Sequence, residues 1–459
     1  MRITTMTMLF SLACVALAGA ARAEDAADAV PLTLDQALQT ADERNLTLAG
    51  IRVELDRADG QLAQAWGSWL PSASATLDYS RMDHEDTADL TSGIADMLNE
   101  AFAGMPFETG EIEEGEPVVI QPRDTLQGSV TVAMPVVAPA AWGGIAVARR
   151  GAEATELSVE DARQELLLGV GQAWYAARMT GSLLELAEAQ VEAAEHHVRV
   201  AEAQLETGTG LRLDQVRAQA DLAAARQDLL DAQLAHASAR DALGVLTGVG
   251  ALVDPVGEAR LDAPDPTAPL DDPGLLAGRT DLRLAEAGVD LARGQLTAAR
   301  LQFLPTVSLA WQGSYQFTEA SGLGSDDPSR WALMAQLDVP LYNHTRVGVV
   351  QESQAALRQA RHQLEDSRRL AELETRQAAR DLTTATAAVD IASQQVALAD
   401  EVFRLALDSF AAGAGSSLEV TEARRSSASA QVNLATTRLE ADLAALTLMR
   451  ATGADMLSQ

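Results

Sequence analysis

The sequence predicts an α+β membrane protein in which long coiled-coil helices are combined with four transmembrane β-strands. Three observations lead to this fold class. Apolar residues recur every seven residues through long stretches, four shorter segments alternate apolar and polar residues, and much of the pattern occurs twice. A seven-residue rhythm specifies helices that wrap around partner helices, and a period of two specifies a strand with one apolar face.

The stretch 184–248 is predicted to form a helical hairpin. A second helix, from Leu213 to Thr247, follows the turn Gly208-Thr209-Gly210. Because such a hairpin cannot bury its apolar seam alone, it needs neighbouring helices. The seam of the first helix consists of Leu184, Ala187, Val191, Ala194, Val198, Ala201 and Leu205.

The pattern of this hairpin is repeated 205 residues later, with the turn Gly413-Ala414-Gly415. A second offset, of 234 residues, relates Leu70-Pro71 to Leu304-Pro305. We therefore expect two structural repeats, residues 24–248 and 272–459, joined by a proline-rich connector at 249–271. The second seam consists of Val389, Ala392, Val396, Ala399, Phe403, Ala406 and Phe410.

Long and short helices are expected in both repeats. The first short helix runs from Leu34 to Trp66, with Thr33 as its N-cap and Gln36 completing a capping box. The helices 213–247 and 275–301 together match the length of the long helix 143–206. This match predicts that these two shorter helices stack end to end, and that the helix after Glu419 meets the one that begins at Leu34.

Four segments of about ten residues are predicted strands that pair as two hairpins. Each has one apolar and one polar face, which is typical of a lipid-facing barrel wall; the alternative is a soluble sheet with one wet face. Four strands cannot close a barrel, whereas three copies of the chain would supply twelve. The strands are 72–80 and 126–134 in the first repeat, and 306–317 and 331–339 in the second.

Proline marks each junction between a strand and a helix, at Pro71, Pro135, Pro305 and Pro340. Proline ends a strand ladder and starts a helix well, so these residues are expected to redirect the chain there. The stretch 82–124, which contains Glu111, Glu113, Glu114 and Glu116, is either a long outward-facing loop or a disordered acidic insertion.

Residues 1–23 are predicted to be a secretory signal peptide. Arg2 provides the positive start, an apolar core follows, and Ala21-Arg22-Ala23 is a small-x-small cleavage site. Lipidation of Cys14 is the disfavoured alternative, because Ser11 occupies the usual leucine position of that signal. The mature protein is expected to contain no cysteine and no transmembrane helix.

Composition excludes several functions. The net charge is −32 and every basic residue is arginine, so nucleic acid is an improbable partner, and a phosphate-binding loop of the GKS type is ruled out. No nucleophile–base constellation or metal-ligand spacing is present, so we expect neither catalysis nor a cofactor nor a metal. The adjacent His196 and His197 are expected on a solvated face. His236 is expected to be a packing irregularity of the seam or a lumen-facing residue rather than a ligand.

The layout resembles the TolC family of outer-membrane efflux proteins. The resemblance covers residues 31–455, and its order, duplication and spacing are more specific than any single motif. It is carried by Leu32-Thr33-Leu34-Asp35-Gln36-Ala37 with Asn45, the Leu-Pro pairs before the strands, the turn patterns Gly208-x5-Asp214 and Gly413-x5-Glu419, and the Thr-Gly endings at 247–248 and 452–453.

The resemblance implies a homotrimer in the outer membrane of a Gram-negative-type envelope. A 12-strand barrel would continue as a helical barrel of twelve columns across the periplasm. The hairpin turns, with Gly208, Gly210, Gly413 and Gly415, would form a closable end that docks on a periplasmic adaptor and an inner-membrane transporter. Such a channel exports drugs, metal ions or proteins. A soluble periplasmic coiled-coil scaffold is the alternative function.

The resemblance also implies acidic residues just inside the closable end, where Asp214, Glu419 and Glu422 match. Three copies would form a ring that attracts cations, but acids in the first turn of a helix also simply favour its dipole. A tyrosine and an arginine that latch this end in the family are replaced by Phe410 and Gly415. Arg212 is a candidate substitute, and core packing is the expected role of Phe410.

Overall fold

The computed structural model describes residues 29–88, 92–102, 118–208, 210–257, 264–266, 276–318 and 327–454. The predicted signal peptide, Thr209, part of the connector and the glutamates at 111, 113, 114 and 116 lie outside these residues. Contacts divide the chain into two compact units. The first consists of residues 1–58, 152–290 and 358–459, and the second of residues 59–151 and 291–357. No helix in the described part of the chain is long and apolar enough to cross a membrane.

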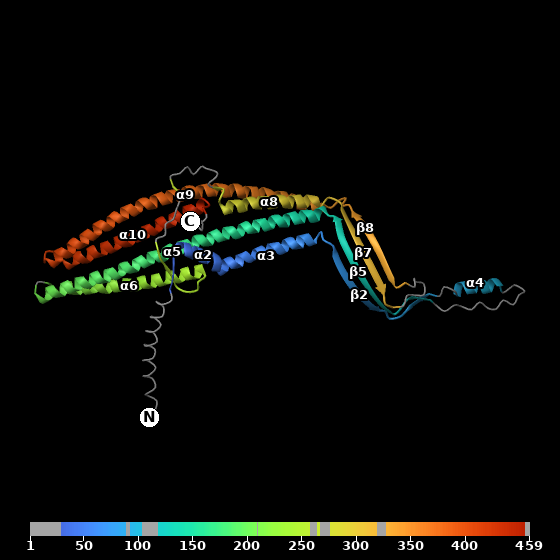
Figure 1. Ribbon diagram of the computed structural model, residues 1–459, viewed down its shortest axis with the longest axis horizontal. Coiled ribbons are helices and arrows are strands. Elements are labelled where there is room, and N and C mark those ends of the chain that lie inside the picture. Colours follow the sequence, from blue (N-terminus) through green and yellow to red (C-terminus); the bar gives the residue numbers. More distant parts are fainter. Residues whose placement is uncertain are drawn as a thin grey trace, which may run out of the picture. The chain divides into compact units, whose positions relative to one another are not determined.

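Two long helices and several shorter ones make up most of the chain (Figure 1). α5 (Pro139–Glu206) and α9 (His344–Ala411) have 68 residues each and begin four residues before their predicted starts. The shorter helices are α2 (Leu34–Arg44), α3 (Leu46–Gly67), α6 (Arg212–Thr247), α8 (Thr280–Leu301) and α10 (Ser417–Ala451).

The predicted coiled-coil seams are confirmed by burial. Every seam residue of α5 and α9 is buried or half-buried, and Ala194, Ala201 and Phe410 are almost fully inaccessible. α5 lies beside α6, and α9 lies beside α10 (Figure 1). The small alanine side chains allow the paired helices to approach closely, as the seven-residue rhythm indicates.

The predicted helix 34–66 is interrupted at Asn45, which separates α2 from α3. The backbone of Asn45 is extended, at φ −65° and ψ 121°, and its side-chain oxygen accepts a hydrogen bond from the Leu48 N–H at 3.0 Å. Asn45 thus caps α3. The capping box of Thr33 and Gln36 at the start of α2 is present as predicted.

The end-to-end pairing of the short helices differs from the prediction. α6 ends against the α2–α3 break, where Asn45 Nδ2 donates to the Leu246 carbonyl at 2.8 Å. α10 ends against the start of α8, where Arg279 donates to the Ala451 carbonyl at 3.2 Å. The expected pairs, 213–247 with 275–301 and the helix after Glu419 with that starting at Leu34, are therefore wrong. Helix lengths could not distinguish the two pairings, because α3 and α8 have 22 residues each.

The two joints are built in the same way at equivalent positions. Each short helix ends in a glycine with a left-handed backbone, Gly248 at φ 71° and Gly453 at φ 71°. Gly248 lies against the backbone of Arg44 and Asn45, and Gly453 lies against that of Gly278 and Arg279. Absence of a side chain lets the two backbones touch, so the joints are held by close packing as well as by hydrogen bonds.

A small parallel sheet that the sequence did not predict covers α2. β1 (Val30–Leu32) pairs with β6 (Val253–Pro255), which lies inside the predicted connector. The Trp174 indole of α5 is fully buried and donates to the Leu32 carbonyl at 3.1 Å. Strands of three residues are too short to show a period of two, which is why they escaped prediction.

The second unit contains a four-stranded antiparallel sheet with the order β2-β5-β7-β8. The strands are β2 (Ser72–Arg81), β5 (Asp124–Val137), β7 (Thr306–Gln316) and β8 (Ser329–Asp338). Both predicted hairpins are present, and β5 additionally pairs with β7. The register aligns Leu77 with Gly128, Gly128 with Tyr315, and Tyr315 with Ser329. The predicted apolar residues of neighbouring strands therefore share one face.

The four prolines lie at or near the strand ends. Pro71 and Pro305 directly precede β2 and β7, and Pro340 follows β8 by two residues. β5 continues past Pro135 to Val137, with an irregular register between these two residues. The prediction that this strand ends at Pro135 is thus wrong by two residues, because a bulge accommodates the missing N–H.

The stretch 82–124 contains secondary structure. β3 (Asp86–Ala88) pairs with β4 (Val118–Gln121), and α4 (Ser92–Phe102) lies between them in the chain. The described part of this stretch is therefore neither a plain loop nor a disordered insertion.

Candidate functional site

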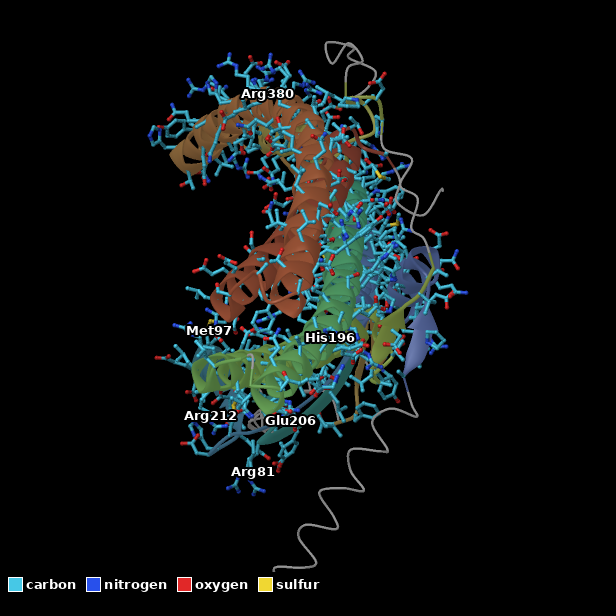
Figure 2. The ribbon with its side chains drawn as sticks, turned by 90° about the vertical axis from the view of Figure 1, so that its left-hand side faces the viewer. Arg81, Met97, His196, Glu206, Arg212 and Arg380 are labelled. Carbon is cyan, nitrogen blue, oxygen red and sulfur yellow. The ribbon has the colours of Figure 1, made fainter. Side chains whose placement is uncertain are left out.

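The two hairpin turns have closely similar geometry. Gly208 and Gly413 have left-handed backbones, at φ 75° and 72°. Gly210 donates to the Gln204 carbonyl at 2.8 Å, and Gly415 donates to the Ser409 carbonyl at 3.0 Å, so each long helix is closed by a backbone hydrogen bond between residues six positions apart. Figure 2 shows Glu206 and Arg212 at the two ends of the first turn. Glycine is required for the backbone geometry at both turns.

The predicted acidic residues lie at the starts of α6 and α10. Asp214 is half-buried in the first turn of α6, and Glu422 is exposed. The Glu419 carboxylate accepts a hydrogen bond from the Ser416 N–H at 3.1 Å, while the Ser416 hydroxyl accepts from the Glu419 N–H at 3.3 Å. Glu419 therefore completes a capping box, in which the backbone N–H groups of Ser416 and Glu419 both find acceptors.

A buried ion pair joins the two hairpins. Two of the guanidinium nitrogens of Arg424 on α10, Nε and Nη2, bind the carboxylate of Asp221 on α6, each at 2.8 Å. The two side chains are only 5% and 1% exposed. Arg424 also donates to the Gln190 side chain of α5 at 2.9 Å. This bidentate arrangement ties α10 to both helices of the first hairpin.

Nearer the turns, His197 of α5 inserts between the hairpins. Its ring is 1% exposed and meets the Phe410 ring edge-on, with centroids 5.3 Å apart. Its Nε2 lies 3.2 Å from the Ser417 hydroxyl, which lies 3.4 Å from the Asp214 carbonyl. In addition, the Gln204 side chain donates to the Phe410 carbonyl at 2.7 Å. We call His197, Phe410, Ser417, Asp221 and Arg424 the hairpin lock.

The lock favours a neutral His197. Burial is the main cause that lowers the pKa of this imidazole, and the nearby Arg424 lowers it further, although Asp221 and Asp214 act in the opposite direction. His197 Nδ1 is buried and has no hydrogen-bond partner among the described residues. If Nε2 carries the proton and donates to Ser417, the Ser417 hydroxyl can donate to Asp214. Protonation would instead place an N–H at Nδ1, where no acceptor lies.

Acidification is therefore expected to weaken the lock. The pKa of His197 is lower in the folded state than in the unfolded chain, where it is about 6.5. Neutral His197 therefore stabilises the folded protein fully above about pH 6.5, and this stabilisation is lost as the pH falls below that value. The slope for one proton is at most about 1.4 kcal/mol per pH unit. Melting temperatures between pH 7.5 and 5.5 should fall less in His197→Asn than in the wild type. The exposed neighbour provides the control, since His196→Asn should keep the wild-type pH dependence; equal curves for all three proteins would contradict this role.

Sequence reasoning missed most of the lock. His197 was expected on a solvated face, which is wrong for His197 and correct for the exposed His196. Arg212, the candidate substitute latch, bonds to Gln215 of its own helix. Phe410 is buried in the core between hairpins, as predicted. Asp221 and Arg424 showed no pattern that distinguishes them from other charged helix residues, because the pairing joins positions 203 residues apart.

His236 contacts the Thr180 hydroxyl through Nδ1 at 3.3 Å and is half-buried between α5 and α6. This placement agrees with its expected role as a packing irregularity. Within the described residues, no group of three or more His, Cys, Asp or Glu side chains could hold a metal ion.

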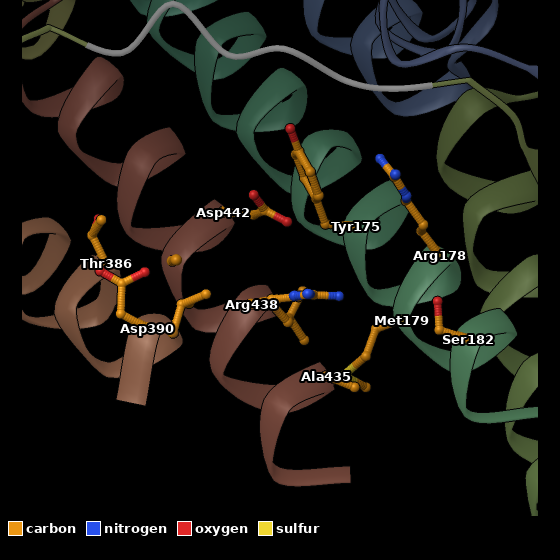
Figure 3. Close-up of a pocket in the computed structure, with 12 residues that line it drawn as sticks. Tyr175, Arg178, Met179, Ser182, Thr386, Asp390, Ala435, Arg438 and Asp442 are labelled. Atoms are coloured by element: carbon orange, nitrogen blue, oxygen red, sulfur yellow. The ribbon is translucent and has the colours of Figure 1, made fainter. Parts of the chain in front are cut away.

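A separate cavity of about 500 Å³ lies between α5, α9 and α10 (Figure 3). Arg178 and Arg438 line it together with Asp442, whose pKa is raised by burial despite both arginines. The Tyr175 hydroxyl is buried without a hydrogen-bond partner in the described part of the chain, and burial also raises its pKa. The cavity has charges of both signs and therefore does not select a ligand class.

Comparisons with known proteins agree on one family. The model of the family described as outer membrane efflux protein matches residues 121–249 and 274–454. The solvent efflux pump outer membrane protein SrpC of Pseudomonas putida is 28% identical over 197 residues, 41% of each chain. The alkaline protease secretion protein AprF of Pseudomonas aeruginosa is 32% identical over 235 residues, 48% of this chain and 46% of AprF.

The fold has solved counterparts. A crystal structure of CusC matches 92% of both chains with a TM-score of 0.76 and 18% sequence identity, which shows a common fold. The chain spans less than half of the length of the two sequence relatives in these matches.

Proposed function

Because the chain belongs to the outer membrane efflux protein family, we propose that it is the outer-membrane duct of a tripartite efflux or secretion system. The family consists of outer-membrane channel proteins. The protein lies in the outer membrane and extends into the periplasm. The relatives serve solvent efflux and protease secretion, so both kinds of export are compatible with this duct.

The four-stranded sheet is the observation that most directly supports a duct, because it favours a homotrimer. Its edge strands, β2 and β8, are exposed along their whole length, and the sheet has one apolar face. Exposed edges invite pairing with another chain, and a closed barrel leaves no edge. Three copies would join β2 to β8 of a neighbour and close a 12-strand barrel. The four prolines Pro71, Pro135, Pro305 and Pro340 would redirect each chain from this barrel into its helices.

Two repeats, 24–248 and 272–459, would give the helical barrel its regular form. The equal lengths of α5 and α9 and the matching joints at Gly248 and Gly453 support this division. Residues 1–23 would be removed as a signal peptide, and residues 249–271 would connect the repeats.

The hairpin turns are the proposed contact with a periplasmic adaptor and, beyond it, an inner-membrane transporter. Gly208, Gly210, Gly413 and Gly415 shape the turns. Exposed apolar side chains beside them, Leu211, Leu213 and Leu418, support a protein contact there. The hairpin lock would hold this end closed until a partner that binds the open form better releases it.

Asp214, Glu419 and Glu422 are proposed to form an acidic ring inside the closable end. In a trimer each acid would occur three times around the axis and favour cations. The capping role of Glu419 is compatible with this ring, because the carboxylate keeps its charge while it accepts the Ser416 N–H.

Reconstitution of the purified protein in a planar lipid bilayer tests the proposal. We expect stepwise, cation-selective currents that are small at rest. Asp214→Arg and Glu422→Arg should reduce cation selectivity, whereas Glu440→Arg, an exposed acid farther along α10, should not. Glu419→Gln preserves the capping hydrogen bond and tests the charge alone. Unchanged selectivity would count against the ring; absence of current from protein that stays soluble without detergent would favour a periplasmic scaffold.

A further inference from the structure

The apolar face of the sheet contains a hollow near the strand ends remote from the helices. Its volume is about 550 Å³, within the range of small-molecule sites, and its lining is almost entirely apolar. All four strands contribute to it. A flat lipid-facing wall needs no such recess, so the hollow requires its own explanation.

Two glycines create the floor of the hollow. A side chain at Gly128 would lie 3.2 Å from the Phe317 ring, and one at Gly313 would lie 2.7 Å from the Trp311 ring. The aromatic rings fold over the glycine backbones instead. Tyr315 supports Phe317 edge-on, with centroids 4.9 Å apart. The floor is thus built from the two glycine backbones and the rings packed on them.

Large apolar side chains form the walls. Leu77 on β2 is 66% exposed, and Trp331 on β8 is 73% exposed. Contiguous exposed apolar surface of this kind marks a site for lipid or protein contact. The lining is apolar rather than polar, which fits a hydrocarbon chain.

Two arginines lie at the same end of the sheet. Met82 donates to the Arg123 carbonyl at 2.8 Å, so Arg123 is adjacent to the chain segment that follows Arg81. Arg81 is labelled in Figure 2, and its side chain is 57% exposed. Its nearest acid, Asp124, is 3.7 Å away and also accepts the Tyr79 hydroxyl at 2.7 Å. The exposed acids Asp83 and Asp86 also lie at this end, and Arg330 of β8 lines the hollow itself. Arg81 and Arg123 are cationic groups that can bind an anion there.

The strand spacing relates Arg81 to the hollow. Arg81, Tyr79 and Leu77 alternate along one strand face, so Arg81 lies about 13 Å beyond Leu77. An anionic group at Arg81 and Arg123 could therefore extend a hydrocarbon chain past Tyr79 into the hollow.

We propose that the hollow holds one acyl chain of a phosphorylated glycolipid of the outer leaflet, with Arg81 and Arg123 binding its phosphate. The inference rests on the proposed function in one respect, which is that the apolar face of the sheet meets lipid. The strand ends at Arg81 and Asp124 are then the outer ends, because the opposite ends continue into helices. Phosphorylated glycolipid is the anionic lipid characteristic of the outer leaflet in a Gram-negative-type envelope.

Lipid retention tests the site. The full-length mature protein is placed in nanodiscs that contain phosphatidylcholine with either lipid A or phosphatidylglycerol, then exchanged into detergent, and bound lipid is counted by native mass spectrometry. We expect about one lipid A per chain. Arg81→Ala with Arg123→Ala should lower retention at least tenfold, as should Gly128→Leu, which fills the floor.

The control variants replace exposed residues that lie outside the hollow. Arg57→Ala removes an exposed arginine of α3, and Leu337→Ala removes an exposed apolar side chain of the same sheet face; both should retain lipid A. Equal retention of phosphatidylglycerol would overturn the glycolipid assignment. Retention unaffected by Gly128→Leu or by the arginine variants would overturn the site. Conductance separates the two proposals: variants that lose lipid A should still conduct, whereas a wild type without current contradicts the duct itself.

Discussion

Replacing Arg424 by alanine is expected to open the hairpin ends and raise the resting conductance. The change leaves the Asp221 carboxylate, 1% exposed, without its bidentate partner, and Arg425, at 3.4 Å, remains as a cationic neighbour. Removing one partner of a buried ion pair costs about 3–5 kcal/mol. If the whole loss falls on the closed state, a 3 kcal/mol change shifts the closed-to-open ratio by about 100-fold. Single-channel recording in planar bilayers measures this shift.

An exposed ion pair of the second hairpin provides the control. Arg404 binds Glu401 at 2.7 Å, but the two side chains are 59% and 53% exposed. Exposed pairs contribute little, so Arg404→Ala should conduct like the wild type. The double variant Asp221→Leu, Arg424→Met removes both buried charges and should recover much of the lost melting temperature. A wild-type resting conductance and melting temperature in Arg424→Ala would rule out the ion pair as part of the lock.

Replacing Gly453 by alanine is expected to disrupt the joint between α10 and α8. The added Cβ would lie 2.5 Å from the Gly278 carbonyl carbon and 2.6 Å from the Arg279 nitrogen, both backbone atoms that cannot rotate away. The left-handed backbone at φ 71° adds about 1–2 kcal/mol. Gly248→Ala should have a similar effect, because its Cβ would lie 2.6 Å from the Arg44 oxygen.

The contribution of close packing can be separated from that of the backbone angle. Gly250 has a similar φ of 70°, but a Cβ there would meet nothing within 4 Å. Gly250→Ala should therefore lose only about 1–2 kcal/mol, whereas Gly453→Ala should lose clearly more. Thermal unfolding followed by circular dichroism in detergent compares the variants. Equal losses at Gly250 and Gly453 would mean that the joint tolerates a side chain and that only the backbone angle matters.

The joints and the lock have different consequences for the proposed duct. The joint at Gly453 involves backbone against backbone, so a side chain there should destabilise the folded protein as a whole. The lock involves side chains between two hairpins, and each hairpin has its own turn and its own contacts between paired helices. Loss of the lock should therefore favour separation of the hairpins before it unfolds either one.

The sequence by itself determined the local elements of this protein. The seven-residue rhythm predicted the buried seams of α5 and α9, and the alternation from Ser72 onward predicted the strands and their apolar face. Capping at Thr33 and the turns at Gly208 and Gly413 were also readable. These features depend on residues within a few turns or one strand, so their physical causes lie within the local sequence.

Only the tertiary structure decided which distant segments meet. The pairing of β5 with β7, the contact of α6 with Asn45, and the burial of His197 all join residues far apart in the chain. α3 and α8 have the same length, so the sequence could not show which of them meets α6 and which meets α10. Most charged residues of a helix also share the same local pattern, so the sequence could not show which of them form a buried ion pair. The pairing of the helices is specified by the backbone contacts at Gly248 and Gly453 and by the buried ion pair between Asp221 and Arg424. Each of these contacts can form with one particular partner segment only.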